Sequence, residues 1–414
     1  MRILFITNFY PPAELGGYAQ LCQEVVDGMK RKGHSVLVLT SKEVGIKIEN
    51  DENGVCRVLN LEVDSRPYYG TIGFFFGREK RLQETISAFI NTINNYHPNV
   101  VFFWGMWNLP KELPLISEKI SSHQTVYYIA DVWPTLNESY QLHWQEGARH
   151  SYTTFLKSTL KHLALKQLSP KRYGEDLRFP NAICVSNALK DFLIESGIPI
   201  KNAQVFFNGI DLTKFQPMEK DLHIDPNDQR LSLLYAGRLT KDKGIHIAIE
   251  ALSVLAKRGH EFQLTVLGSG SKEYSALLKG LCKKFGIYNR VQFIDRIPRN
   301  LVPSVLQEHH VLVCPFISFD ALPRITQEAM AVGLVVVGSN VGGLSEIIQN
   351  HKNGLLFEPG SVDGLVECIE ELLDPKIFSS LAREGQNTVR EKFDILKLVD
   401  NIDRFLNEVA GEKS

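Results

Sequence analysis

Two carboxylates stand eight positions apart in the stretch FDALPRITQEAMAVG, residues 319–333. Asp320 precedes Pro323, and Glu328 falls in a run that reads as a helix. Because proline suits the first helical turn, we expect Asp320 in the loop before the helix and Glu328 on it. Eight helical residues rise about 12 Å, whereas the paired acids that cleave a glycosidic bond lie roughly 5 to 10 Å apart. The spacing therefore favours an interpretation in which the two acids bind the two ends of one elongated ligand. The alternative is structural, with Asp320 as a helix cap and Glu328 on the surface.

A second candidate site is the loop AGRLTKDKGIH, residues 236–246, which follows an aliphatic run and ends at a helix start. It contains Arg238 and Lys243. A guanidinium and an ammonium group both suit phosphate oxygens, so the pair predicts a diphosphate site. Most loop arginines and lysines are simply solvated. The place of this loop after a strand favours the binding interpretation, because ligands bind beyond the carboxyl ends of strands in open α/β sheets.

The loop NFYPPAELGGYAQ, residues 8–20, carries a third candidate. Gly16 and Gly17 open a helix there, and unpaired backbone N–H groups could meet a phosphate or a sugar hydroxyl. A plain turn before a helix is the alternative. Neither this loop nor the later GSGSKE, residues 268–273, has the G-x-G-x-x-G pattern of dinucleotide-binding folds.

Composition limits the class of protein. With 414 residues the chain is too long for one ordinary core, so we expect two domains. A net charge of −1 gives no overall footprint for nucleic acid. The six cysteines are scattered without a C-x-x-C pair, which argues against a zinc site and fits a reducing compartment. The N-terminal MRILFIT reads as a strand, and the most apolar window, NVVFFWGMW, is shorter than the roughly 20 residues of a spanning helix and reads as a buried strand. We therefore predict a cytoplasmic protein.

Strands and helices alternate in two similar segments. The first segment consists of RILFIT, a helical stretch at residues 18–34 and SVLVLT. The second consists of LSLLYAG, a helical stretch at residues 244–260 and FQLTVLG. Both helices end in basic residues beside a glycine, which suits the negative helix end and a left-handed cap. Further strands are expected at VQFI, VLVCPF, LVVVGS and GLLFEPG. The fold class predicted is α/β, with two doubly wound Rossmann-like domains.

The domain boundary is expected near residue 206. The polar run MEKDLHIDPNDQR follows it closely. This gives a first domain at residues 1–206, a second at 207–390, and a C-terminal helix at 391–414 that packs back on the first. With two sheets, the cleft between the domains is the default ligand site.

In order along the chain, seven pieces carry a family likeness: YPPAELGG, ICVSNALKDFL, VFFNGIDLTKF, AGRLTKDKG, VLGSG, DALPRITQEAMAVGLVVVGSNVGGLSEII and NGLLFEPG. Over nearly its whole length the chain resembles family 4 of the retaining glycosyltransferases, which have the GT-B fold of two Rossmann-like domains facing across a cleft. The resemblance implies a nucleotide-sugar donor bound mainly by the second domain and an acceptor bound mainly by the first. It implies transfer with retention of configuration, without a metal or other cofactor.

The resemblance also assigns roles to single residues. Arg238 and Lys243 match the basic pair on the diphosphate, Glu328 the glutamate on the ribose hydroxyls, and Asp320 a residue that reaches the donor sugar. Gly17 matches a glycine near the diphosphate or the transferred sugar, and Ile297 lies where backbone atoms meet the base. The implied donor-binding set is Gly16, Gly17, Gly237, Arg238, Lys243, Ile297, Asp320, Leu322, Pro323 and Glu328, and the implied catalytic set is Arg238, Lys243, Asp320 and Asp131.

The chain departs from the family pattern at three places. DALP replaces the common E-G-F-G, which shortens the acidic side chain and leaves the identity of the donor sugar open. Asp295 stands where a glycine is common. In YYIADVWP, Ala130 precedes Asp131 where many members have His-Asp. Asp131 either contacts the sugar or acceptor, or only caps the following turn.

One basic segment bears on the acceptor. Between Gly147 and Gly174 there is no acid, and the cations are Arg149, Lys157, Lys161, Lys166, Lys171 and Arg172. Nearby, YYGTIGFFFGREKR, residues 68–81, sets aromatic beside basic residues. Contact with the inner face of a membrane and a lipid-linked acceptor is one interpretation. An ordinary solvated helix and a core-facing loop are the other.

The leading hypothesis is thus a retaining hexosyltransferase of polysaccharide biosynthesis. Its donor would be a UDP-, GDP- or ADP-sugar, and its acceptor a glycan, a glycolipid or a small molecule. A sugar-nucleotide epimerase and a non-catalytic nucleotide-sugar-binding subunit are the competing hypotheses.

Overall fold

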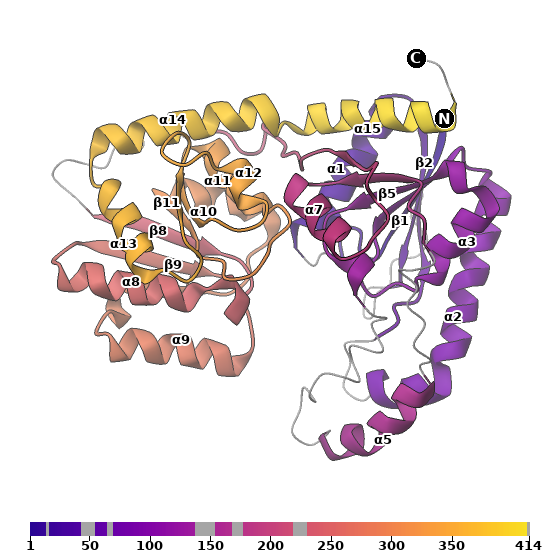
Figure 1. Cartoon of the computed structure of the whole chain (residues 1–414), viewed down its shortest axis with the longest axis horizontal. Coiled ribbons are helices and arrows are strands. Elements are labelled where there is room, and N and C mark those ends of the chain that lie inside the picture. Colours follow the sequence, from indigo (N-terminus) through magenta and orange to yellow (C-terminus); the bar gives the residue numbers. More distant parts are fainter. Residues whose placement is uncertain are drawn as a thin grey trace. The chain divides into compact units, whose positions relative to one another are not determined.

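The computed structural model describes residues 1–13, 16–42, 54–63, 69–136, 154–167, 177–217 and 230–411 (Figure 1). The chain forms two compact units. The first comprises Met1–Val185, Leu189–Phe206 and Val399–Ser414, and the second comprises Ser186–Ala188 and Phe207–Leu398. Each unit is built round its own parallel sheet.

The sheet of the first unit has the strand order β3-β2-β1-β4-β5-β6-β7, and every pairing is parallel. The aliphatic runs RILFIT and SVLVLT are β1 and β2, as predicted, and Ile3 to Ile6 of β1 are fully buried. Continuous apolar runs are typical of strands covered on both faces. The strands are β1 (Arg2–Thr7), β2 (Ser35–Ser41), β3 (Val55–Leu59), β4 (Val100–Gly105), β5 (Thr125–Ile129), β6 (Asn181–Cys184) and β7 (Gln204–Val205).

The helices of the first unit are α1 (Gly17–Arg31), α2 (Tyr69–Tyr96), α3 (Glu112–Ser121), α5 (Thr154–Gln167), α7 (Asn187–Glu195) and most of α15 (Ile395–Ala410). The expected end of α1 is confirmed: Lys30 and Arg31 lie in its last turn, and Gly33 has φ 85°. Basic side chains there face the negative helix end.

The second unit has the strand order β10-β9-β8-β11-β12-β13, also parallel throughout. Leu233 of β8 packs in one large core with helix α8, whereas its neighbour Leu234 is equally buried outside that core. Both sheet faces are therefore covered, and the predicted doubly wound fold is confirmed. The strands are β8 (Leu231–Ala236), β9 (Phe262–Leu267), β10 (Val291–Ile294), β11 (Val311–Cys314), β12 (Val335–Ser339) and β13 (Leu355–Phe357). The helices are α8 (Ile245–Lys257), α9 (Lys272–Lys284), α10 (Val302–Gln307), α11 (Arg324–Val332), α12 (Leu344–Ile347), α13 (Val362–Glu371) and α14 (Pro375–Lys392).

The strand order reverses once in each sheet. In the first sheet the reversal lies between β1 and β4, and in the second between β8 and β11. At such a point two neighbouring strands lead into loops that diverge to opposite faces, which leaves a crevice beyond their carboxyl ends. The loop segments at residues 8–13 and 106–111 flank the first crevice, and those at 237–244 and 315–323 flank the second.

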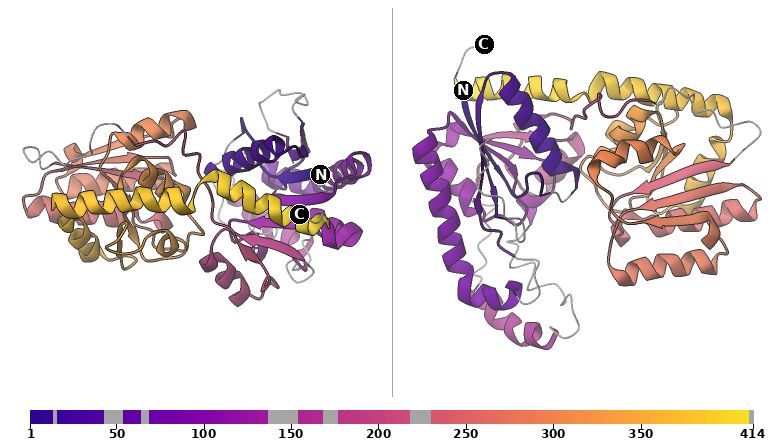
Figure 2. Two further views of the ribbon diagram at one scale, coloured as in Figure 1. Left: turned by 90° about the horizontal axis from the view of Figure 1, so that it is seen from above. Right: turned by 180° about the vertical axis from the view of Figure 1, so that it is seen from behind.

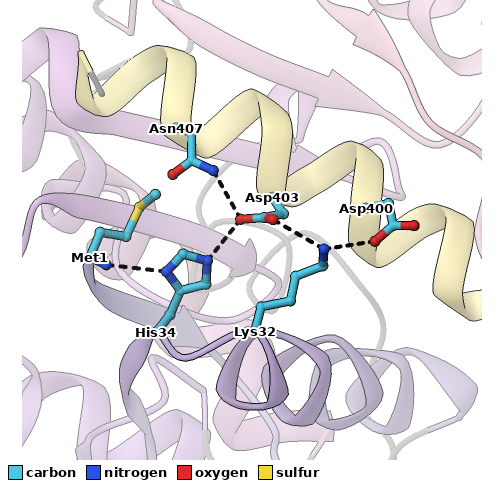
Figure 3. A network of polar contacts seen from close by, with 6 residues as sticks. All are labelled: Met1, Lys32, His34, Asp400, Asp403 and Asn407. Atoms are coloured by element: carbon cyan, nitrogen blue, oxygen red, sulfur yellow. Dashed lines mark hydrogen bonds and ion pairs between the residues drawn. The ribbon is translucent and has the colours of Figure 1, made fainter. Parts of the chain in front are cut away.

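Helix α15 packs beside α1 in the first unit, as the views of Figures 1 and 2 agree. Its polar edge is held by a network at the end of α1 (Figure 3). The Asp403 carboxylate lies 2.7 Å from His34 Nε2 and 3.2 Å from Lys32 Nζ, and Lys32 also pairs with Asp400 at 2.8 Å. Burial raises the pKa of Asp403, but the hydrogen bonds from His34 and Lys32 together outweigh it and hold the pKa below its usual range. The carboxylate is therefore ionised at neutral pH.

A glycine sets the distance between these two helices. A Cβ atom built on Gly28 would lie 2.5 Å from Cγ2 and 2.8 Å from Cγ1 of Val399, which is 3% exposed. No side chain larger than hydrogen fits there unless Val399 moves. Close packing of α15 on α1 therefore requires glycine at position 28.

We predict that Gly28→Ala loosens α15. Overpacking costs about 1–3 kcal/mol, and the better helix propensity of alanine returns only about 0.5–1 kcal/mol. Faster hydrogen exchange of amides 399–410 is expected. Gly280→Ala in α9 is the control, because a Cβ there meets nothing within 4 Å. If Gly28→Ala costs as much in a Val399→Ala background as in the wild type, the steric explanation is wrong.

Candidate functional site

The two loops that flank the second crevice are joined by an ion pair. Lys243 ends the short 3-10 turn Lys241–Lys243 after β8, and Asp320 lies in the loop after β11. Lys243 Nζ donates a hydrogen bond to Asp320 Oδ2 and lies 4.4 Å from the centroid of the Phe316 ring. Both side chains keep some exposure, 14% for Lys243 and 20% for Asp320. The structure thus brings two of the predicted site residues into direct contact at the rim of the sheet.

Arg238 lies in the same loop as Lys243. Its backbone carbonyl accepts hydrogen bonds from Tyr235 Oη at 2.6 Å and from Thr240 N at 3.1 Å, which fix the turn after Gly237. Arg238 is exposed, and within the described ranges its guanidinium makes no ion pair. Its charge is therefore open to an anion from solvent, whereas that of Lys243 is shared with Asp320.

Glycines let these loops approach each other. Gly244 has φ 68°, and a Cβ there would meet the carbonyl oxygen of Pro315. Gly342 has φ 56° and lies against the Asp320 backbone, while Gly343 N donates to the Asp320 carbonyl at 2.8 Å. Gly268 of the GSGS run packs on the Gly237 carbonyl. That run is thus explained by backbone packing, and the turn after β12 supports Asp320, a role that the sequence analysis missed.

Glu328 lies in the interior of the second unit. It is fully buried on α11, its Oε1 forms an ion pair with Arg299, and Arg324 Nε lies 3.8 Å from the same oxygen. Its second oxygen, Oε2, is buried and has no hydrogen-bond partner among the described residues. The alternative of a surface glutamate is therefore wrong. The alternative of Asp320 as the cap of α11 is also wrong. Pro323 occupies the N-cap position, and no side chain makes a capping hydrogen bond to this helix.

The sequence analysis did not identify the two arginines at Glu328. Arg324, four residues before Glu328 on α11, was detectable because residues at that spacing share a helix face. Arg299 was not, since it comes from a 3-10 turn at Arg299–Leu301, on a different element. Its guanidinium lies 5.4 Å from the Phe215 ring centroid. Two arginines therefore face one buried carboxylate in the interior of the second unit.

The remaining donor-site candidates of the second unit lie near these groups in the fold. Pro323 is the N-cap of α11 rather than a member of its first turn, with φ −72° and ψ 113°. Leu322 is 5% exposed, and its carbonyl accepts a hydrogen bond from Asn208 Nδ2 at 3.3 Å. Ile297 is half-buried in the loop after β10, two residues before Arg299. Because proline has no N–H, position 323 offers no backbone donor to a phosphate.

Gly16 and Gly17 lie in the first unit, where they open α1 as predicted. Gly16 is the N-cap, with φ 87°, and is exposed. The next residue, Tyr18, donates through Oη to the carbonyls of Trp104 at 2.5 Å and Tyr128 at 3.0 Å. The start of α1 is thereby fixed over the ends of β4 and β5.

Asp131 follows β5 at the same sheet edge. Its Oδ1 accepts a hydrogen bond from Trp133 N at 2.8 Å, so the residue does cap the turn at Trp133–Thr135. Burial raises the pKa of Asp131, and the Trp133 N–H offsets this only in part. The pKa of Tyr18 is also raised, chiefly by burial and further by electrostatic interaction with the neighbouring Tyr128 hydroxyl and Asp131 carboxyl groups. One carboxylate oxygen holds the turn, and a role for the other stays a prediction.

The basic segment is only partly described. Lys161 is half-buried and Lys166 is exposed on α5. The side chains of Arg149, Lys157, Lys171 and Arg172, and most of those in residues 68–76, lie outside the described residues. No helix in the described ranges is long and apolar enough to cross a membrane.

Comparison with known proteins finds one family model, two relatives by sequence and a similar solved structure. The family model for glycosyl transferases group 1 matches residues 219–390. An uncharacterized glycosyltransferase of Methanocaldococcus jannaschii is 26% identical over 99% of this chain and 100% of its own length. Glycogen synthase of Mycobacterium tuberculosis is 25% identical over 95% of this chain and 91% of that protein. The structure of Anabaena HepE in complex with UDP-glucose is similar in fold, with a TM-score of 0.70 at 19% identity, over 99% of this chain and 100% of that one.

We predict that Asp131→Asn stabilises the protein at neutral pH, because the amide keeps the acceptor for Trp133 N without burying a charge. Since the pKa of Asp131 is raised, the wild type carries this penalty above its folded pKa and loses it as the pH falls toward the ordinary value of about 4. In urea unfolding, the difference in free energy of unfolding between Asp131→Asn and the wild type should therefore shrink as the pH falls from about 8 to about 4. Asp131→Ala, which also loses the cap, should cost about 1 kcal/mol at low pH. If the wild type is more stable than Asp131→Asn at neutral pH, this explanation is wrong.

Proposed function

We propose that this chain is a glycosyltransferase that transfers a hexose from a nucleoside diphosphate sugar with retention of configuration; the match of residues 219–390 to the group 1 glycosyltransferase model and the two Rossmann-like domains support this. One observation supports the donor site most directly. Lys243, Asp320 and the exposed Arg238 all come from the two loops that flank the reversal of strand order in the second sheet. That is where an open α/β sheet binds its ligand.

The diphosphate lies, in this proposal, against Arg238 and Lys243. Arg238 offers a planar pair of donors to phosphate oxygens, and Lys243 offers a compact charge. The ion pair with Asp320 directs the Lys243 ammonium toward the crevice before a donor arrives. The Asp320 carboxylate then accepts hydrogen bonds from hydroxyls of the donor sugar. Because Pro323 supplies no N–H, the side-chain cations carry more of the phosphate recognition.

The ribose is assigned to Glu328. The Oε2 atom of this carboxylate is buried without a hydrogen-bond partner in the described part of the chain. A buried acceptor that makes no hydrogen bond costs about 1–3 kcal/mol of stability. A ribose hydroxyl would satisfy it. Because Glu328 is fully buried, ribose binding there requires a covering side chain to move, and the partly exposed Arg299, which pairs with the other oxygen, is the proposed one. Ile297, two residues earlier, is the proposed backbone contact of the base.

The chemistry that follows is largely electrostatic. As the bond from the anomeric carbon to the diphosphate oxygen breaks, positive charge develops on the sugar and negative charge on the leaving group. Arg238 and Lys243 stabilise that negative charge, which is the function of a preorganised cation site. The acceptor hydroxyl attacks from the same face, and its proton passes to the departing phosphate oxygen. Two fixed cations make a metal unnecessary in this scheme.

The relatives narrow the choice among the candidate donors and acceptors. HepE binds UDP-glucose, which supports a nucleotide-sugar donor and places UDP first among the three candidate nucleotides. Glycogen synthase supports a saccharide acceptor. The likeness to glycogen synthase favours glycosyl transfer over epimerisation or a purely binding role. A cytoplasmic location and contact with the inner face of the membrane stay predictions.

We predict that at least one of UDP, GDP and ADP raises the melting temperature. Nucleotide at a hundred times its Kd adds about 2.7 kcal/mol. Glu328→Gln should raise that Kd about tenfold, because the amide accepts hydroxyl hydrogen bonds less strongly than a carboxylate. Glutamine is preferred to alanine because truncation leaves the guanidinium groups of Arg299 and Arg324 without their shared carboxylate. Glu370→Gln, at the surface pair with Arg258, is the control. An unchanged Kd in Glu328→Gln removes the ribose assignment.

We predict that Lys243→Met lowers kcat about a hundredfold, near 3 kcal/mol, because the leaving group loses a cation in the transition state. Lys241→Met is the matched control, since Lys241 is an exposed lysine in the same 3-10 turn. Release of nucleoside diphosphate in the presence of an acceptor extract measures turnover, and the NMR coupling of the product's anomeric proton reports retention. Equal effects at positions 241 and 243 would contradict a specific role for Lys243.

A further inference from the structure

A tryptophan lies exposed at the crevice of the first sheet. Trp107 follows β4, which pairs with β1 where the strand order reverses. It is 46% exposed, whereas Trp104 and Trp133 are 1% and 4% exposed. The sequence analysis placed Trp107 in a buried strand, and this is wrong, because β4 ends at Gly105. Tryptophan carries the largest apolar surface of any side chain, so exposing nearly half of it needs a reason.

The turn that carries Trp107 is fixed on both sides. On one side, Asn8 Nδ2 donates to the Trp107 carbonyl at 2.9 Å, and Asn8 N donates to the Gly105 carbonyl at 2.9 Å. On the other side, the Asn108 amide group exchanges two hydrogen bonds of 2.8 Å with the backbone of Val63. Asn108 itself has φ 62°, a conformation that asparagine tolerates. The backbone that carries Trp107 is therefore held in place from both sides.

The exposed ring has an aromatic neighbour. The centroids of the Trp107 and Phe9 rings lie 6.3 Å apart with 33° between their planes. Phe9 comes from the loop after β1, so the two rings flank the reversal of strand order from either side. Together they form a small apolar platform at the place where this class of sheet binds ligands.

We propose that Trp107 is a stacking platform for a sugar ring of the acceptor, an inference that rests on the proposed glycosyl transfer. The C–H groups on one face of a pyranose carry partial positive charge, and the face of an aromatic ring carries partial negative charge. A side chain with two rotatable bonds on a backbone fixed in advance loses little entropy when it is covered. The acceptor is therefore a saccharide, and Trp107 selects it by shape.

The surrounding charges favour a neutral sugar over a lipid phosphate. Asn8, Phe9 and Trp107 are uncharged. The cation nearest in sequence, Lys111, is 8% exposed; it donates to the Leu136 carbonyl and lies 5.8 Å from the Trp133 ring centroid. The charged group described at the end of the neighbouring strand β5 is Asp131, an acid that would repel a phosphate and can accept hydroxyl hydrogen bonds. One cation does touch the loop that carries Phe9: the half-buried Arg57 of β3 donates hydrogen bonds to the carbonyls of Tyr10 and Pro11, so backbone oxygens already occupy its guanidinium. A saccharide acceptor fits this environment better than an anionic one.

The test uses the full chain with saturating UDP on an array of mono- to tetrasaccharides. The wild type is expected to bind at least one glycan, Trp107→Phe to retain most of that binding, and Trp107→Ala to lose about tenfold in affinity. Tyr288→Ala is the matched control, because Tyr288 is also 46% exposed but lies in the second unit, and its binding should equal that of the wild type.

Three outcomes overturn the inference: equal glycan binding by Trp107→Ala and the wild type, no glycan bound by a wild type that binds UDP, or binding to phosphatidylglycerol vesicles in place of glycans. The proposed function fails separately, when the wild type neither binds a nucleotide nor releases nucleoside diphosphate in the presence of an acceptor extract. Because Trp107 is exposed, circular dichroism of Trp107→Ala should match the wild type, so that lost binding is not lost folding.

Discussion

Parallel strands end at one edge of their sheet, and this constraint decides where chemistry can occur in the protein. All strands of a parallel sheet deliver their following loops to the same edge, and the loops diverge only where the strand order reverses. In the second unit those loops carry Lys243 and Asp320, whose ion pair joins them. In the first unit they carry Phe9 and Trp107. The same topology therefore produces a charged rim in one unit and an aromatic rim in the other, and only the loop residues differ.

The backbone at these edges is as specialised as the side chains. Gly244, Gly342 and Gly268 each lie where a Cβ would meet a backbone carbonyl of a neighbouring loop. Loops with side chains at these positions would stand further apart, and the Lys243–Asp320 pair would not close. A site made from several loops is thus only as well positioned as the contacts between their backbones. Substitution of these glycines changes the site without touching any group that meets a ligand.

Local signals predicted the fold well. Aliphatic runs, helical periodicity and glycine caps gave β1, α1, β2 and their counterparts β8, α8 and β9, because each depends on a few consecutive residues. The loop positions of Arg238, Lys243 and Asp320 followed from the strands before them. What could not be predicted depends on contacts between distant segments. Arg299 reaches Glu328 from a separate element, and the exposure of Trp107 depends on where β4 ends and on the hydrogen bond from Asn8. Periodicity carries no information on either.

Charge balance in the second unit determines how a donor can bind. Lys243 is paired with Asp320, and Glu328 with Arg299 and Arg324, so these charges already have partners in the free protein. A donor that uses them must exchange one set of contacts for another, and its affinity is the difference between the two sets. Arg238, exposed and without an ion pair among the described residues, is the exception, and in the proposed donor site it is the cation that is not already shared. Contacts that strengthen only as negative charge builds on the leaving group then contribute to rate rather than to binding. In the proposed donor site, such an arrangement lowers the affinity for the donor's ground state while it keeps the cations in position for the transition state.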